Sequence, residues 1–128
     1  MVNRLEIAGK LRILLNDKKL YTRSDITLSS LAKQLKTNRT YLSEIIHSHF
    51  DSTFIGLINL LRVKEAQLKF QDTTNHPRRI EEIAHSVGFR SKSSFNTAFK
   101  RYTGLTPSQY REKQKETNTT KTAEIKLR

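Results

Sequence analysis

Two stretches of the chain place short polar and basic side chains at helical spacing, where they can form hydrogen bonds. The first stretch contributes Arg39, Thr40, Ser43, Glu44 and His47, and the second contributes Lys92, Ser93, Ser94, Asn96, Thr97, Lys100 and Arg101. Exposed helix surfaces more often carry Glu, Lys and Gln, because these residues have a higher helix propensity than Ser, Thr and Asn. Short hydroxyl and amide side chains let a helix lie deep in the major groove of DNA and reach base edges. The residue types therefore favour base contacts, while a merely solvated polar face remains the alternative.

The charge of the chain supports contact with a nucleic acid. Its 128 residues include 24 Lys and Arg and 12 Asp and Glu, which gives a formal net charge of +12. A domain this small and this basic is typical of proteins that bind a polyanion. Charge that serves only solubility is the alternative on composition alone.

The residues present do not support metal binding or catalysis. His47 and His49 lie two residues apart and would point about 200° away from each other on a helix, so they cannot share one metal ion. Ser93 and Ser94 have no neighbouring base that would activate a hydroxyl as a nucleophile. The chain has no cysteine, which excludes thiolate metal sites and fits a reducing cytoplasm. We predict no catalytic site, no metal site and no cofactor, and therefore no enzyme.

Helices must position the polar stretches, because hydrophobic residues recur at helical spacing along almost the whole chain. We predict an all-α fold of about seven helices. The first helix should end near Lys19 and bury Leu5, Ala8, Leu11 and Leu15. The long fourth helix should bury Phe54, Leu57, Ile58, Leu61 and Leu68, and the sixth should bury Phe95, Ala98, Phe99 and Tyr102.

Capping residues mark where these helices begin and end. The predicted N-caps carry hydroxyl or amide side chains, and they are Thr27, Asn38, Ser91 and Thr106. Gly88 and Gly104 are placed to end helices in the left-handed conformation. The polar stretch 71–77 is a predicted loop, and the chain from Thr117 is a predicted flexible tail.

The polar stretches belong to two copies of one pattern, a short helix followed by a turn and a longer helix. Before the turn the two copies match at an offset of 52 residues, pairing Leu31, Ala32 and Leu35 with Ile83, Ala84 and Val87. After the turn the offset is 53 residues, pairing Leu42, Ile45, Ile46, Asp51 and Phe54 with Phe95, Ala98, Phe99, Gly104 and Pro107. The pattern predicts two helix-turn-helix units in tandem, each of which would place its second helix in the major groove of double-stranded DNA.

These assignments divide the chain into an N-terminal lobe at 1–52, a connecting helix at 53–70, a C-terminal lobe at 71–116 and the tail at 117–128. The first helix-turn-helix unit spans about 27–50 and the second about 80–103. Two unequal units in one chain replace the two-fold symmetry that single-unit proteins obtain by dimerising. We therefore expect a monomer that binds an asymmetric site.

Two other classes of protein compete with this interpretation. One is a non-specific architectural or RNA-binding basic protein. The six phenylalanines, all on faces predicted to be inward, argue against a surface that stacks on single-stranded RNA. The other class is a basic amphipathic module on a membrane surface, which would need the apolar helix faces that the core requires.

The most specific motif is Ile80-Glu-Glu-Ile-Ala-His-Ser-Val-Gly-Phe89, followed by Gly104-Leu-Thr-Pro-Ser-Gln-Tyr-Arg111. Together with the segment 28–35 and with Arg62 and Ala66, these motifs resemble the DNA-binding domain of the AraC/XylS family of transcription regulators. The resemblance covers about residues 26–111.

Three residues depart from the family pattern. Asp51 stands where Gly is usual, and Arg79 stands where a hydroxyl cap is usual. Glu44 stands where many members carry a basic or neutral residue that contacts a base.

The resemblance implies seven helices in two lobes, DNA as the ligand of both second helices, and RNA polymerase as a further partner. Most members are longer and carry a separate sensing domain, which this chain lacks, so we expect a DNA-binding fragment of a cytoplasmic regulator. The residues Leu20-Tyr21 and Asp25-Ile-Thr-Leu28 resemble the junction of large membrane-anchored or two-component members. A membrane-anchored parent therefore stays open, as does the choice between activator and repressor.

Overall fold

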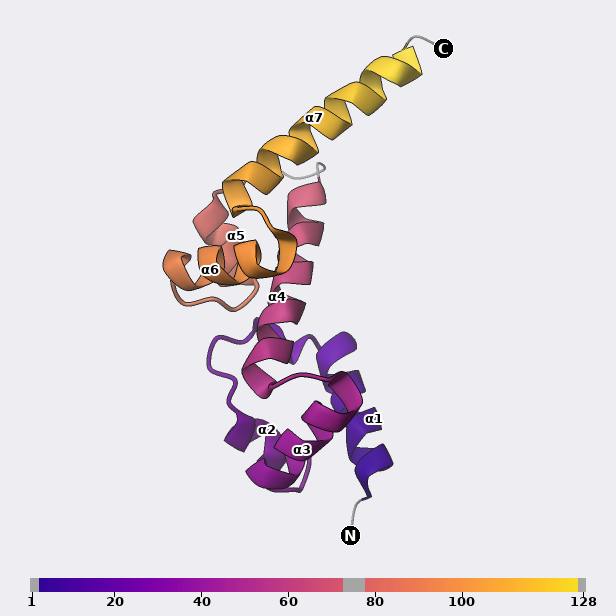
Figure 1. Cartoon of the computed structure of the whole chain (residues 1–128), viewed down its shortest axis with the longest axis vertical. Helices are drawn as coiled ribbons and strands as arrows, with labels where there is room; N and C mark the ends of the chain where they lie inside the picture. The colour runs from indigo at the N-terminus through magenta and orange to yellow at the C-terminus, as the bar shows by residue number, and fades with distance from the viewer. Residues whose placement is uncertain (1–2, 73–77, 127–128) are drawn as a thin grey trace. The chain divides into compact units, whose positions relative to one another are not determined.

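The computed structural model describes residues 3–72 and 78–126, with side chains as far as residue 117, and this part of the chain is helical without strands. The elements are α1 (Arg4–Asn16), the 3-10 helix η1 (Leu20–Thr22), α2 (Leu28–Gln34), α3 (Arg39–Phe50), α4 (Phe54–Gln71), α5 (Ile80–Ser86), α6 (Lys92–Thr103) and α7 (Pro107–Lys126) (Figure 1). Within the described residues, the predicted all-α fold of about seven helices is confirmed. No helix within the described residues is both long and apolar enough to cross a membrane.

The chain forms two compact units, residues 1–62 and 63–128. The boundary falls inside α4, so this helix supplies side chains to two separate hydrophobic cores. Phe54, Leu57 and Ile58 join the first core, whereas Val63, Ala66 and Phe70 join the second.

The two units repeat the same elements at the offsets expected from the sequence. Both α2 and α5 have 7 residues, and both α3 and α6 have 12 residues. The turn after the shorter helix contains one left-handed residue in each unit, Lys36 with φ 58° and Gly88 with φ 110°. The longer helix ends at another pair of left-handed residues, Asp51 and Gly104. The repeat therefore extends from the sequence pattern to the backbone conformation of its turns.

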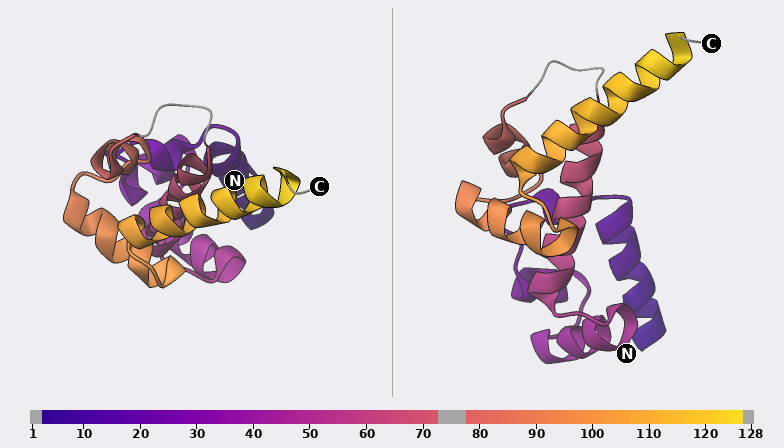
Figure 2. Two further views of the ribbon diagram at one scale, coloured as in Figure 1. Left: turned by 90° about the horizontal axis from the view of Figure 1, so that it is seen from above. Right: turned by 45° about the horizontal axis from the view of Figure 1, so that its top comes forward.

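The first core is built by α1, α2, α3 and the beginning of α4. Helix α1, drawn in indigo, packs against α3 (Figure 2). The buried residues of this core are Ile7, Ala8, Leu11, Leu15, Tyr21, Leu31, Ala32, Leu35, Leu42, Ile45, Ile46, Phe54, Leu57 and Ile58.

The second core is dominated by aromatic rings. Phe99 lies at its centre, with ring centroids at 5.5 Å from Phe95, 5.7 Å from Phe70 and 5.3 Å from Tyr110. Pairs of rings at such distances and tilted angles add about 0.5–1.5 kcal/mol each to the burial of their apolar area. These contacts hold the buried side of α6 in place.

The predicted N-caps are confirmed at all four positions. The Asn38 side chain accepts a hydrogen bond from the Tyr41 backbone N–H, and Ser91 Oγ accepts one from the Ser94 N–H. Thr27 forms a capping box with Ser30, and Thr106 forms one with Gln109. Each cap fixes the residue at which its helix starts.

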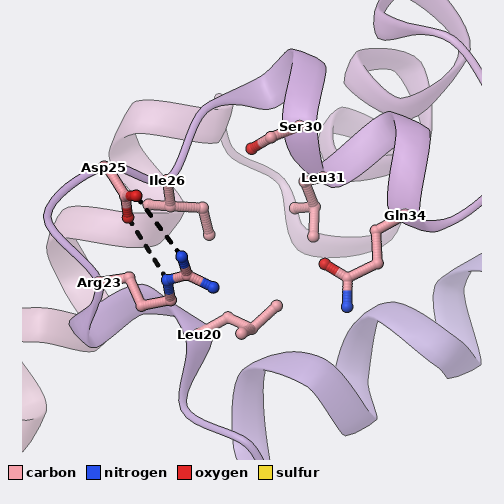
Figure 3. Close-up of a pocket in the computed structure, with 7 residues that line it drawn as sticks. All are labelled: Leu20, Arg23, Asp25, Ile26, Ser30, Leu31 and Gln34. Atoms are coloured by element: carbon pink, nitrogen blue, oxygen red, sulfur yellow. Dashed lines mark hydrogen bonds and ion pairs between the residues drawn. The ribbon is translucent and has the colours of Figure 1, made fainter.

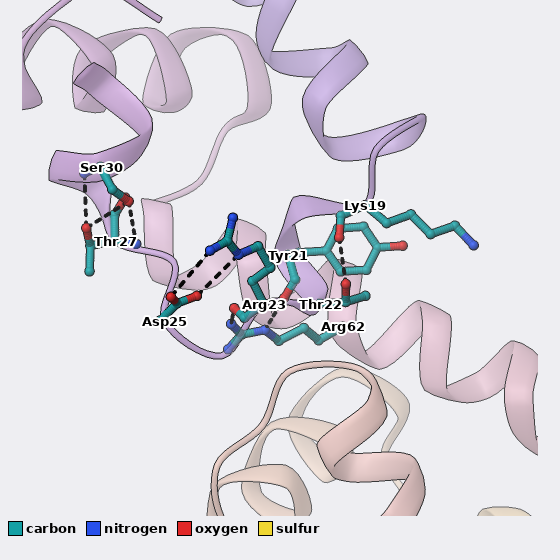
Figure 4. A network of polar contacts seen from close by, with 8 residues as sticks. All are labelled: Lys19, Tyr21, Thr22, Arg23, Asp25, Thr27, Ser30 and Arg62. Atoms are coloured by element: carbon teal, nitrogen blue, oxygen red, sulfur yellow. Dashed lines mark hydrogen bonds and ion pairs between the residues drawn. The ribbon is translucent and has the colours of Figure 1, made fainter. Parts of the chain in front are cut away.

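Arg62 fastens the segment after α1 to α4. Its Nε donates a hydrogen bond of 2.6 Å to the Tyr21 carbonyl, and its Nη2 donates one of 2.9 Å to the Arg23 carbonyl (Figure 4). The carbonyls of a 3-10 turn have few partners of their own. A single guanidinium therefore satisfies the end of η1 and sets the path that leads into α2.

The prediction of burial from the sequence is wrong for three hydrophobic residues. Leu5 is 75% exposed, Leu68 is 59% exposed and Tyr102 is 36% exposed, although all three were expected to be inward. Ile7 takes the place of Leu5 in the first core. Both positions fit a helical stripe with Ala8, Leu11 and Leu15, and only the packing of α1 on α3 decides between them.

The ends of three helices also differ from the sequence predictions. Helix α1 ends at Asn16, three residues before Lys19, and Lys19 adopts a left-handed conformation with φ 49°. Helix α4 includes Gln71, and the remainder of the predicted loop, residues 73–77, lies outside the described residues. Helix α7 continues from Thr117 to Lys126, in a segment that contains neither Gly nor Pro, whereas the sequence pattern indicated no helix there.

Candidate nucleic-acid interface

Helix α3 presents the first predicted set of polar side chains to solvent. Its opposite side is fixed by Leu42, Ile45 and Ile46, whose side chains are fully buried in the first core. The remaining face carries the five predicted residues, all exposed: Arg39, Thr40, Ser43, Glu44 and His47. A continuous polar face of this width suits insertion of the helix into a groove.

Helix α6 presents the second set in the same way. Phe95, Ala98 and Phe99 are buried in the second core. The predicted residues on the other face are exposed at Lys92, Ser93, Ser94, Thr97, Lys100 and Arg101, and Asn96 is half-buried.

Ser94 is exposed, but it also takes part in the N-cap of α6. Its backbone N–H donates to Ser91 Oγ at 3.1 Å, and its own Oγ accepts a hydrogen bond of 2.9 Å from Ser91 Oγ. Because these bonds engage Ser94 at the start of α6, its hydroxyl is less free for an external ligand than that of Ser93.

Some of these side chains contact charged or aromatic neighbours. Glu44 Oε2 lies 3.1 Å from Nη2 of Arg4, a residue of α1. Lys92 Nζ lies 3.9 Å from Glu81 Oε1 on α5. Arg101 lies with its guanidinium carbon 5.9 Å from the centre of the Tyr102 ring. The lysine and arginine heads remain exposed and can approach phosphates.

The structure brings each predicted set together on one helix, and the two sets lie on separate units. It also adds Arg4, which the sequence did not indicate. Arg4 and Glu44 are 40 residues apart, so no local spacing could have linked them. Only the packing of α1 on α3 places the guanidinium beside the polar face.

A small pocket in the first unit is a further candidate site. It has a volume of about 140 Å³ and is lined by Leu20, Arg23, Asp25, Ile26, Ser30, Leu31 and Gln34 (Figure 3). Arg23 and Asp25 face each other across 3.4 Å and form an ion pair, so the pocket offers no uncompensated charge. Ligand sites for small molecules are usually about 300–1,000 Å³. The pocket is therefore a weaker candidate than the helix faces.

Comparisons with known proteins agree with these observations. A sequence-family model described as a helix-turn-helix domain matches residues 31–113. The raffinose operon transcriptional regulatory protein RafR of Pediococcus pentosaceus is 32% identical over 85 residues, which are 66% of this chain and 30% of that protein. The melibiose operon regulatory protein of Escherichia coli strain K12 is 31% identical over 86 residues, which are 67% of this chain and 28% of that protein. The chain thus spans less than a third of the length of these curated relatives.

A solved structure shares the arrangement of helices. The C-terminal domain of AraT, a response regulator of Geobacillus stearothermophilus, is 34% identical with a TM-score of 0.72, and the match covers 84% of each chain. The repeated units, their exposed polar helices and these similarities lead to one conclusion. The chain belongs to the AraC/XylS family of transcription regulators and comprises its tandem helix-turn-helix domain.

Proposed function

We propose that the chain binds double-stranded DNA with sequence specificity by inserting α3 and α6 into successive major grooves. The observation that carries this proposal is the repeat itself. Two helices of 12 residues, capped and terminated alike, each present an exposed polar face in a chain of net charge +12. Relatives named as operon regulators support the same activity.

The polar faces of α3 and α6 match at five pairs of positions, and the two residues differ in every pair. This difference supports an asymmetric binding site. Arg39 corresponds to Lys92, Ser43 to Asn96 and His47 to Lys100. Different side chains read different bases, so the two half-sites should differ in sequence. Their centres should lie about 34 Å apart, one turn of DNA, because both helices must approach from one side.

Selection from a randomised duplex library, followed by titration, tests this proposal. The selected duplex, a scrambled duplex and a structured RNA are each titrated at about 50 mM and about 200 mM salt. Specific recognition predicts a preference for the selected duplex that persists at the higher salt. Equal affinity for all three, lost together as salt rises, would instead identify an architectural or RNA-binding protein.

Glu44 is proposed to contribute specificity rather than affinity. A carboxylate on this face is repelled by phosphates, yet it can accept a hydrogen bond from N4 of cytosine, which is worth about 1–3 kcal/mol of discrimination. Glu44→Ala should raise affinity for random DNA and abolish the preference at one base pair of the first half-site. A uniform gain across all single-base variants would make Glu44 a spectator and leave Arg39, Thr40 and Ser43 as the readers.

We further propose that the domain is monomeric and belongs to a longer regulator with a sensing domain and RNA polymerase as a partner. The short span of the match within the curated relatives supports the longer parent. Sedimentation of this chain tests the monomer, and transcription from a promoter bearing the selected site tests whether the domain activates.

A further inference from the structure

Arg4 approaches the polar face of α3 from a different helix. Its Nη2 lies 3.1 Å from Glu44 Oε2, and its guanidinium carbon lies 5.2 Å from the centre of the Tyr41 ring. A single side chain of α1 therefore touches both a predicted base-reading residue and an aromatic residue one turn before it.

Packing of α1 in the first core brings the backbone of Arg4 close to α3. Ile7, Ala8 and Leu11 are buried in the core that also contains the inward residues of α3. Arg12, two turns further along α1, stacks in the same way over Phe50 at 5.2 Å. Two arginines of one helix thus lie over rings near the two ends of α3, and the buried side of α1 keeps both arginines on the helix face next to α3.

The ion pair is worth little in the free protein. The Arg4 and Glu44 side chains are 47% and 55% exposed, and an ion pair this exposed to solvent adds little to the stability of the fold. Its value changes when a duplex covers α3, because water is displaced and the local dielectric falls. An unpaired carboxylate would then face the phosphates of the groove.

We propose that Arg4 is a positioning residue of the DNA-reading surface, which neutralises Glu44 and orients its carboxylate so that an acid can remain on this face. The inference rests on the proposed function, because it requires that α3 contacts DNA. It assigns to α1 a part in DNA binding that lies outside both helix-turn-helix units.

A double-mutant cycle on the full chain tests the coupling. Fluorescence anisotropy on a random-sequence duplex and on the selected duplex is measured for wild type, Arg4→Ala, Glu44→Gln and the double variant. When Glu44 is present, Arg4→Ala should weaken binding to either duplex about fivefold to tenfold, within the range of contacting charged pairs. With Glu44→Gln, the same change should weaken binding less than about twofold.

Three controls separate this role from others. Arg4→Lys keeps the charge and should recover most of the lost affinity. Arg12→Ala removes the equivalent stacked arginine and should have the same effect whether residue 44 is Glu or Gln. The midpoint of thermal unfolding of Arg4→Ala should stay within about 4 °C of wild type, so a loss of binding is not a loss of fold.

Two results would overturn the proposal. A loss of equal size in both backgrounds, with the salt dependence reduced by about one unit, would make Arg4 an independent phosphate contact. Unchanged binding in both backgrounds would make the pair irrelevant to DNA. A wild-type chain that binds no duplex would refute the proposed function itself, and this outcome is distinct from a chain that binds without coupling.

Discussion

Asp51 ends α3 in a left-handed backbone conformation, which L-residues rarely adopt. Its φ is 50° and its ψ is 44°, while the matching residue of the second unit is Gly104 with φ 79°. A left-handed backbone costs an L-residue about 1–2 kcal/mol, and Asp lies near the lower limit because it tolerates this region better than most residues. The first unit therefore bears a backbone strain that the second unit avoids.

We predict that Asp51→Gly raises the free energy of unfolding of the first unit by about 1 kcal/mol. Relief of the left-handed backbone contributes about 1 kcal/mol, and removal of an acid from the C-terminal end of α3 contributes about 0.3–1 kcal/mol. The larger freedom of Gly in the unfolded chain subtracts about 0.4–1 kcal/mol. For a cooperative unit of about 60 residues, the midpoint should rise by about 4–8 °C.

Thermal and urea unfolding, followed by circular dichroism, measure this change. Asp51→Ala is the matched control, because it removes the charge and keeps a Cβ in the left-handed conformation. Gly104→Ala makes the reverse change in the second unit, where an added Cβ would meet nothing within 4 Å, so it should destabilise through the backbone alone by about 1 kcal/mol. Equal stability of Asp51→Gly and Asp51→Ala would refute the reasoning.

Three further predictions concern binding, packing and assembly. Lys100→Ala or Arg101→Ala should weaken binding to all duplexes alike and reduce the slope of log affinity against log salt concentration by about 0.9 per lost phosphate contact. Lys113→Ala, at another exposed lysine, serves as control. A changed sequence preference at constant slope would contradict the assignment of these residues to phosphate contacts. Arg62→Met should destabilise the first unit by about 1–3 kcal/mol in urea unfolding, because two charge-assisted bonds to carbonyls are lost; an unchanged midpoint would show that those carbonyls are satisfied otherwise. Analytical ultracentrifugation should find a monomer, and a tight dimer would refute the asymmetric-site proposal.

Much of the fold follows from local chemistry in the sequence. The starts of α2, α3, α6 and α7 are set by side chains within three residues of the first helical position, so a cap pattern predicts them. The register of the repeat is also readable, because each unit must bury the same positions of a short and a long helix. These features involve residues close in sequence.

The features that escaped prediction depend on distant residues. Leu5 and Ile7 fit the helical stripe of α1 equally well, and the choice between them is made by α3. The Arg4–Glu44 pair needs the same packing. Lys19 and Lys36 adopt left-handed conformations that residue type alone would not suggest, because a lysine carries no preference for that region. The exposed faces of α3 and α6 were predictable, whereas the bases they would contact are not set by the helix pattern.

The division of α4 between two cores has a consequence for the exchange of amide hydrogens. Opening of the first unit removes the packing of Phe54, Leu57 and Ile58, and opening of the second removes that of Val63, Ala66 and Phe70. In an α-helix each amide donates to the carbonyl four residues earlier, so amides 58–62 of α4 depend on the first unit alone, and amides 67–71 depend on the second. Each group should therefore exchange at the opening free energy of its own unit. A difference in stability between the two units should appear as a step in protection along this one helix.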